Sequence, residues 1–577
     1  ISMLGQSQPV QTVLANQIQG RKQLLTGLSG SAKTLFLATL YKQQRQPLLI
    51  IESNTFQANQ VAEDLANQVN SDQLYTFPVE EVMAAEIATS SPEAKAERVR
   101  TLSFLATGKK GIVVTSIAGI RRLLPSVRQW QASQLTIKAD SQIDPTTLAT
   151  QLGEMGYTRD KLVGKPGEFA MRGDIIDIFP LDADNPVRIE LFDTEVDSMR
   201  TFAADTQRSI ENLTEVQVMP ATDLLANQAQ LMLAGEQLAL DYEQQAQTIQ
   251  AKTEQQALAT HFETPIERLK AGERLENMAL FVDYLYPDRD GLLNYFKKSG
   301  LVIFDDYPRI QETQRVLSEE AANWQTEMLA NRRLLPNQQM LLDLHQVIKK
   351  DQHAQLYLSL FQKGMGNLKL DELTNLPTRS VQQFFSQMPL LKTEIAHWQK
   401  QKQTVVVLVS DQKRVKKMDQ TFHDFEIDAV VAKKTQLQQG RVQIVQGTLQ
   451  NGFELPDLKL VVLTEKELFN TAPKKKVRRQ TLANAERLKS YNELKPGDYV
   501  VHVNHGIGEY VGMETLEVDG VHQDYITILY RDNGKLFIPV SQLNMVQKYV
   551  SAEAKTPKIN KLGGGEWQKT KNKVSAK

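Results

Sequence analysis

Residues 27–34, GLSGSAKT, have the types and spacing of a loop that binds the phosphates of a nucleotide. In such a loop, glycines let backbone N–H groups surround the phosphates, a lysine contacts the β and γ oxygens, and a hydroxyl holds Mg²⁺. Gly27, Lys33 and Thr34 stand at the required spacing. The second glycine of the pattern is replaced by Ala32, whose β-carbon presses on the phosphates or forbids the backbone angle that the loop needs. We therefore expect a phosphate-loop fold with a vestigial loop.

A working nucleotide site also needs an acidic strand end that holds Mg²⁺ and positions water. The apolar run LVIF is followed by Asp305 and Asp306, where an Asp-Glu pair is usual, so this second motif is degenerate as well. The sequence shows neither a glutamine-rich adenine-reading motif before the loop nor an arginine-rich motif that would supply an arginine finger. Without that arginine a nucleotide motor loses orders of magnitude in rate. Catalysis is not expected, and weak nucleotide binding at Lys33 stays open.

Three other groups of residues suggest chemistry but are better explained as structure. His502 and His505 resemble a metal pair, but the sequence offers no third ligand nearby, so we expect no metal. Asp174 and Asp177 could act as acid and base, but their pattern favours a turn residue and a strand-edge residue. The basic run PKKKVRR (473–479) could contact phosphate, although exposed basic linkers are usually only solvated.

Length and composition limit the class of protein. A chain of 577 residues exceeds what one hydrophobic core supports, so several domains are expected. The net charge of −1 means that any affinity for nucleic acid depends on local patches. The absence of cysteine excludes disulfides and favours a reducing cytoplasm. No apolar run approaches the ~20 residues of a membrane-spanning helix, so no membrane partner is expected.

Periodicity predicts a multidomain α/β protein. Helix patterns alternate with buried strands before and after residues 131–218. Within that region the pattern is one of short strands with Gly and Asp turns. Short strands about ten residues apart close the chain, which is typical of a small barrel of SH3 or Tudor type. The predicted segments are the first part of a phosphate-loop domain (1–130), its α+β insertion (131–218), the second part (219–380), a second α/β domain of unknown role (381–470), a basic linker (471–492), the barrel (493–552) and a basic tail (553–577).

The run from GYTRDKLVGKPGEFAMRGDIIDIFP to DTEVDSMRTFAADTQRS, residues 156–209, resembles the UvrA-binding domain of the excision-repair helicase UvrB. The same domain occurs in bacterial transcription-repair coupling factors of the Mfd family. The flanking segments resemble the divided first motor domain of UvrB. In UvrB the phosphate loop is intact and a DNA-gripping hairpin follows; Ala32 and the lack of an evident hairpin separate this chain from UvrB. The run from LKPGDYVVHVNHG to SQLNMVQKYV is similar to the RNA-polymerase-interacting domain that coupling factors share with CarD-type regulators.

The resemblance implies partners and the residues that contact them. It implies that the UvrB-like module binds UvrA through Arg172, Arg188 and Phe192, and that the barrel binds the β subunit of RNA polymerase through Leu516. Arg188 and Phe192 are four residues apart in a strand pattern, so their side chains share a face. From spacing alone, the hydrophobic core is the favoured interpretation of Phe192, and the core of its own barrel is the alternative interpretation of Leu516.

In this family a DNA translocase motor follows, with ATP and Mg²⁺ as cofactors and DNA as its partner. The chain stops at Lys577, before any motif of that motor. We therefore expect the N-terminal half of a coupling factor, acting as an adaptor that holds no cofactor of its own. Two alternatives stay open: an ATPase or helicase like UvrB, and a CarD-like transcription regulator whose activity resides in residues 493–577.

Overall fold

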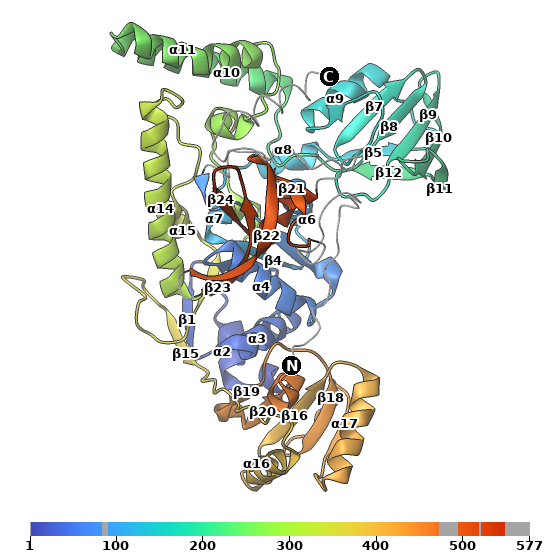
Figure 1. Ribbon diagram of the computed structural model, residues 1–577, viewed down its shortest axis with the longest axis vertical. Helices are drawn as coiled ribbons and strands as arrows, with labels where there is room; N and C mark the ends of the chain where they lie inside the picture. Colours follow the sequence, from blue (N-terminus) through green and yellow to red (C-terminus); the bar gives the residue numbers. More distant parts are fainter. Residues whose placement is uncertain (1, 84–90, 472–493, 503, 519–520, 549–577) are drawn as a thin grey trace. The chain divides into compact units, whose positions relative to one another are not determined.

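The structure of the chain is a computed structural model (Figure 1). It describes all residues except 1, 84–90, 472–493, 503, 519–520 and 549–577. The chain divides into two compact units, one of residues 1–90 and 94–481 and the other of residues 91–93 and 482–577. Among the described residues, no helix combines the length and the apolar character that crossing a membrane requires.

A seven-stranded parallel sheet forms the centre of the first unit, in the order β15-β1-β14-β13-β2-β4-β3. Its inner strands are buried on both faces, which explains why they read as continuous apolar runs. The insertion divides the sequence but not the sheet, because strands from both sides of it pair with one another. The strands are β1 (Lys22–Thr26), β2 (Leu48–Glu52), β3 (Leu74–Phe77), β4 (Ile112–Ser116), β13 (Leu301–Asp305), β14 (Ala354–Ser359) and β15 (Glu372–Asn375).

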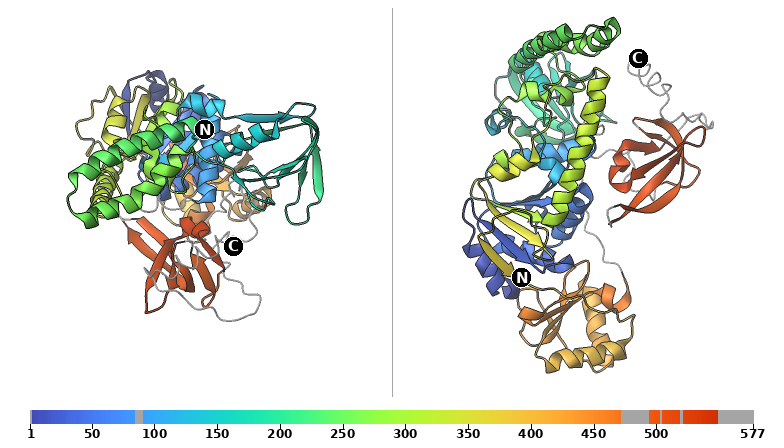
Figure 2. Two further views of the ribbon diagram at one scale, coloured as in Figure 1. Left: turned by 90° about the horizontal axis from the view of Figure 1, so that it is seen from above. Right: turned by 90° about the vertical axis from the view of Figure 1, so that its left-hand side faces the viewer.

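Helices cover this sheet and continue into a helical extension. The extension centres on a hairpin of two long helices, α10 and α11, which lie side by side in Figures 1 and 2. Gly235 of α10 lets the helices approach closely, since a β-carbon there would lie 2.7 Å from the backbone nitrogen of Lys270. The helices are α1 (Ser2–Gly5), α2 (Gln8–Ala15), α3 (Gly30–Gln43), α4 (Thr55–Ala66), α6 (Pro92–Leu105), α7 (Ile117–Ile120), α8 (Val127–Ala132), α10 (Gln228–Thr248), α11 (Lys252–Lys270), α12 (Val282–Leu285), α13 (Leu292–Tyr295), α14 (Tyr307–Ala330) and α15 (Leu344–Lys350).

The insertion is a six-stranded sheet, in the order β11-β10-β9-β8-β7-β6, with α9 (Pro145–Glu154) packed on one face. Buried apolar residues alternate along β9 with residues that are less buried, as VRIELF shows. Two further strands, β5 (Leu135–Lys138) and β12 (Glu215–Val218), pair with each other where the chain enters and leaves. The six strands are β6 (Thr158–Arg159), β7 (Glu168–Arg172), β8 (Ile175–Ile178), β9 (Val187–Phe192), β10 (Glu195–Phe202) and β11 (Ser209–Leu213).

The second α/β domain is a five-stranded sheet in the order β17-β18-β16-β20-β19, parallel except for β19. Its core contains Trp398, Phe422 and the apolar side chains of the central strands. The elements are α16 (Met388–Lys400), β16 (Thr404–Val409), α17 (Gln412–Asp424), β17 (Val430–Ala432), β18 (Val442–Gln446), β19 (Phe453–Leu455), β20 (Leu460–Leu463) and α18 (Glu465–Phe469).

The second unit is an antiparallel five-stranded sheet in the order β24-β23-β22-β21-β25. Its core includes Tyr510, Ile526, Ile528 and Tyr530. The strands are β21 (Tyr499–His502), β22 (Gly506–Val518), β23 (Val521–Leu529), β24 (Lys535–Pro539) and β25 (Val546–Lys548). The predicted multidomain α/β class with a parallel sheet is confirmed, whereas closure of this last sheet into a barrel stays a prediction.

Candidate protein-interaction site

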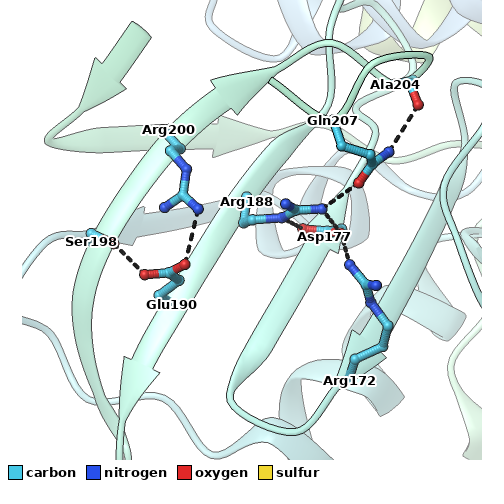
Figure 3. A network of polar contacts seen from close by, with 8 residues as sticks. All are labelled: Arg172, Asp177, Arg188, Glu190, Ser198, Arg200, Ala204 and Gln207. Atoms are coloured by element: carbon cyan, nitrogen blue, oxygen red, sulfur yellow. Dashed lines mark hydrogen bonds and ion pairs between the residues drawn. The ribbon is translucent and has the colours of Figure 1, made fainter. Parts of the chain in front are cut away.

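The insertion sheet has one apolar face and one polar face. The apolar side chains of β8 and β9, such as Ile176 and Ile189, pack with Leu148 and Leu152 of α9. Because side chains alternate along a strand, the intervening residues point to the other face. That face gathers three arginines and two carboxylates from four neighbouring strands, and Figure 3 shows how they meet.

Asp177 is the centre of this polar network. It lies on β8, directly opposite Arg188 of β9, and is only 1% exposed. Its Oδ1 accepts a hydrogen bond from Arg188 Nε at 2.9 Å and its Oδ2 one from Arg188 Nη2 at 3.0 Å, a bidentate pair. A longer contact of 3.4 Å joins Arg172 Nη2 to Oδ2 (Figure 3). One buried carboxylate therefore orients both arginines that the sequence singled out.

The expectation for Asp177 as a strand-edge residue is wrong, because β8 lies between β7 and β9 inside the sheet. The local pattern RGDIIDIF does not reveal which strands will flank it. Asp174, in contrast, occupies the turn between β7 and β8, as expected. The two aspartates are not an acid–base pair, since Asp177 is committed to Arg188.

Arg188 makes two further contacts besides its pair with Asp177. Its Nη2 also donates to Gln207 Oε1 at 2.7 Å, and its guanidinium carbon lies 4.2 Å from the centre of the Phe202 ring. The hydrogen bonds with Asp177 raise the pKa of Arg188 above its ordinary value. Arg172 has fewer contacts, and its side chain is 46% exposed against 11% for Arg188. Arg172 is thus the more accessible of the two arginines, while Arg188 is held in a fixed orientation.

A second ion pair extends the network along β9 and β10. Arg200 Nη2 donates to Glu190 Oε1 at 2.9 Å, and Ser198 Oγ donates to Glu190 Oε2 at 3.3 Å (Figure 3). The hydrogen bond from Arg200 lowers the pKa of Glu190. Sequence reasoning missed both Glu190 and Arg200. The signal was the alternation in VRIELF, which places Arg188, Glu190 and Phe192 on one face.

Phe192 ends β9 and is 76% exposed. The chain turns immediately after it, with Asp193 in the left-handed region at φ 59°. The interpretation of Phe192 as core is therefore wrong. An exposed aromatic ring on the same strand face as a fixed arginine has the composition of a binding hot spot.

In the predicted phosphate loop, Lys33 is paired with a carboxylate of a neighbouring strand. Lys33 Nζ lies 2.8 Å from Asp305 Oδ1 at the end of β13. Burial disfavours its charge, but the Asp305 carboxylate in direct contact with it outweighs burial and raises the pKa of Lys33. Burial and the neighbouring Asp305 raise the pKa of Glu52, which favours a protonated Glu52 that donates to Asp305. The lysine and the carboxylate that would meet a nucleotide and its metal are thus paired with each other.

The remaining loop residues take structural positions. Gly27 adopts φ 99°, and a β-carbon there would lie 2.7 Å from the carbonyl oxygen of Leu376. Ala32 and Thr34 are buried within α3. Asp306 stands before the first residue of α14 in the left-handed region, with Arg309 Nε 3.8 Å from its Oδ2.

The predicted sites of the second unit are described only in part. Leu516 lies on β22 opposite Gln523 of β23, near the end of the hairpin. The rings of His502 and His505 are 4.7 Å apart, and in the described part of the chain no group of three or more candidate ligands could hold a metal. The basic run 473–479 and the tail 553–577 lie outside the described residues.

Comparison with known families identifies two of these domains. The model of the UvrB interaction domain matches residues 135–224, which contain the whole polar network. The model of the CarD-like/TRCF RID domain matches residues 494–550. The chain therefore joins a UvrB interaction domain to a CarD-like/TRCF RID domain, which confirms both resemblances.

Similarity to individual proteins extends over nearly the whole chain. The chain is 41% identical over 555 residues to the transcription-repair-coupling factor of Bacillus subtilis (strain 168), covering 96% of this chain and 47% of that protein. It is 38% identical over 567 residues to the same factor of Staphylococcus aureus (strain MRSA252), covering 97% and 48%. These matches support a transcription-repair coupling factor, and the chain spans about half the length of these relatives.

Proposed function

We propose that this chain is the N-terminal half of a transcription-repair coupling factor and acts as an adaptor. The insertion domain recruits UvrA, and the CarD-like domain binds the β subunit of a stalled RNA polymerase. The remainder of such a factor would supply ATP-dependent movement on DNA. The observation that carries the proposal is the buried Asp177, which fixes two arginines beside the exposed Phe192 within a UvrB interaction domain.

The geometry suits recognition of a protein surface. Arg172 offers free guanidinium N–H groups that can pair in a planar, bidentate manner with a carboxylate of the partner. Arg188 is already immobilised by Asp177, so binding costs little further side-chain entropy. Phe192 adds apolar area at the edge of the same face. Such a preorganised cluster supports tight and selective docking without catalysis.

The polymerase-binding proposal rests on the edge of β22. In the described part of the second unit, β21 pairs with β22 only over Gly506–Glu509. The part of β22 from Gly512 to Val518, which includes Leu516, is paired with β23 on one side and with no described strand on the other. An unpaired strand edge can add to a sheet of a partner, with alternate side chains providing selectivity.

The adaptor function is tested by calorimetric titration of the chain with purified UvrA. We expect a dissociation constant of about 1 μM or lower for the unmodified chain, and loss of binding in Arg172→Ala/Arg188→Ala. A matched control, Arg128→Ala/Arg268→Ala, removes two arginines from other parts of the first unit and should bind as the unmodified chain does. Absence of binding by the unmodified chain, or equal binding by the Arg172/Arg188 variant, would contradict the proposal.

A further inference from the structure

A loop of the second α/β domain reaches the phosphate loop of the first. Residues 447–452 connect β18 to β19, and Asn451 lies in this loop. Its Oδ1 accepts hydrogen bonds from the backbone N–H of Ser31 at 3.1 Å and from Ser31 Oγ at 2.5 Å. The backbone N–H of Asn451 donates in turn to Ser31 Oγ at 3.0 Å. Three hydrogen bonds thus attach Asn451 to the first turn of α3.

This position is the one that a phosphate takes in a working loop. The first N–H groups of a helix have no partner within the helix and carry partial positive charge, so they attract an acceptor or an anion. Here the Asn451 side-chain oxygen is that acceptor. A β-carbon on Gly30 would lie 3.2 Å from Asn451 Nδ2, which shows that the amide lies directly against the glycine of the loop. The space in front of the loop is therefore filled by protein.

Other contacts anchor the 447–452 loop in place. Gln68 Nε2 of the first domain donates to the Thr448 carbonyl oxygen at 2.9 Å. Leu449 and Phe453, on either side of Asn451, are buried in the same apolar cluster as Phe36 of α3. The buried side chains and the Gln68 hydrogen bond therefore hold the 447–452 loop, and with it the Asn451 amide, against the first domain.

We propose that the second α/β domain, residues 381–470, serves as a built-in ligand of the vestigial phosphate loop. The Asn451 amide takes the place of a phosphate group, excludes nucleotides, and uses the anion-binding geometry of the loop to join the two domains. The Lys33–Asp305 pair satisfies the charges that a nucleotide and its metal would otherwise meet. This role is separate from UvrA recruitment and does not depend on it.

The experiment is a calorimetric titration with Mg·ATP and with inorganic pyrophosphate. We expect no saturable binding by the unmodified chain up to about 1 mM, and a gain of at least about tenfold in affinity for Asn451→Gly, since removing the side chain uncovers the helix start. The matched control is Gln450→Gly, one residue away in the same loop, which should remain without binding. A folded Asn451→Gly variant that binds no better than the unmodified chain would overturn the proposal.

A second variant covers the case in which Asn451→Gly fails to fold. Asn451→Asp keeps both acceptor contacts with Ser31 and places a negative charge at a helix start, which is favourable there. We expect it to exclude nucleotides and to melt at or above the temperature of the unmodified chain. Melting at a lower temperature, or nucleotide binding by Asn451→Asp, would contradict an acceptor in the phosphate position. Titration with UvrA should give equal affinity for all these variants, so the two proposals are tested independently.

Discussion

Asp177 is a buried charge that organises the proposed interaction surface from below. It is the acceptor for Arg188 and the nearest carboxylate to Arg172, yet it is almost inaccessible itself. We expect Asp177→Asn to lower UvrA affinity by at least about tenfold, because an amide cannot hold both guanidinium groups. It should also lower the free energy of unfolding by about 3 kcal/mol, since Arg188 would lose its buried counter-charge. Calorimetry and chemical unfolding measure the two effects.

The control for this prediction is Asp174→Asn, which changes the same residue type in the exposed turn before β8. It should leave UvrA affinity within about twofold of the unmodified chain. If Asp177→Asn unfolds more easily but binds UvrA as tightly as Asp174→Asn, Asp177 stabilises the sheet and does not position the arginines.

We expect His502 to make the stability of the second unit depend on pH. Burial, with a contribution from His505, lowers the pKa of His502 to about 4, and its Nδ1 accepts the backbone N–H of Asn504. An unfolded histidine titrates near pH 6.5, so below that pH the unfolded state binds the proton more readily than the folded state. Stability is complete above about pH 6.5 and falls toward pH 4, by at most about 3 kcal/mol. The loss should be smaller in His502→Gln.

Unfolding followed from pH 7.5 to pH 4, for the unmodified chain and for His502→Gln, measures this dependence. The difference in free energy of unfolding between the two proteins should change between about pH 6.5 and about pH 4, where His502 takes up a proton on unfolding. Parallel curves would show that protonation of His502 does not limit the stability of the second unit.

The sequence predicted part of the residue-scale picture. It singled out Arg172 and Arg188, and the structure places both around Asp177. It did not predict Asp177 as their organiser, because that role depends on the pairing of β8 with β9, which no local pattern specifies. The exposure of Phe192 was available from alternation: the buried positions in β9 are Val187, Ile189 and Leu191, so Phe192 falls on the polar face.

Among the elements, strands with continuous apolar runs were predicted from the sequence. The buried strand β14, whose run contains a glutamine, was not. The runs that became β2, β4 and β13 are continuous and apolar, so their type was clear from the sequence. β14 was missed although it lies at the centre of the sheet, because Gln355 interrupts its apolar pattern. The structure satisfies Gln355 with hydrogen bonds to Asp351 and Tyr357, and local sequence does not reveal such partners.

The helical hairpin depends on close packing at Gly235. We expect Gly235→Val to lower the free energy of unfolding by about 1–3 kcal/mol, because its side chain would meet the backbone of Lys270 in α11. The matched control is Gly153→Ala in α9, where a β-carbon meets nothing within 4 Å. That change should stabilise by about 0.5–1 kcal/mol, as alanine favours a helix over glycine. Chemical unfolding measures both, and equal effects of the two changes would contradict the packing argument.

For the whole molecule, the important feature is that the two proposed partner sites belong to different compact units. The UvrA site rests on the core of the insertion, and Leu516 lies in the unit with its own core of Tyr510, Ile526 and Ile528. The sequence predicted these two kinds of domain through two separate resemblances, and the family models match both. Effects of changes at independent sites usually add.

We therefore expect that changes at one site leave the other partner's affinity unchanged. Leu516→Asp should weaken binding to RNA polymerase by at least about tenfold, because it places a charge on the β22 edge that the partner would cover. The same change should leave UvrA affinity within about twofold, and Arg172→Ala/Arg188→Ala should do the converse. Titrating each partner against the single-site variants and their combination measures the coupling energy. A coupling above about 1 kcal/mol would contradict independent sites and would mean that binding of one partner changes the affinity for the other.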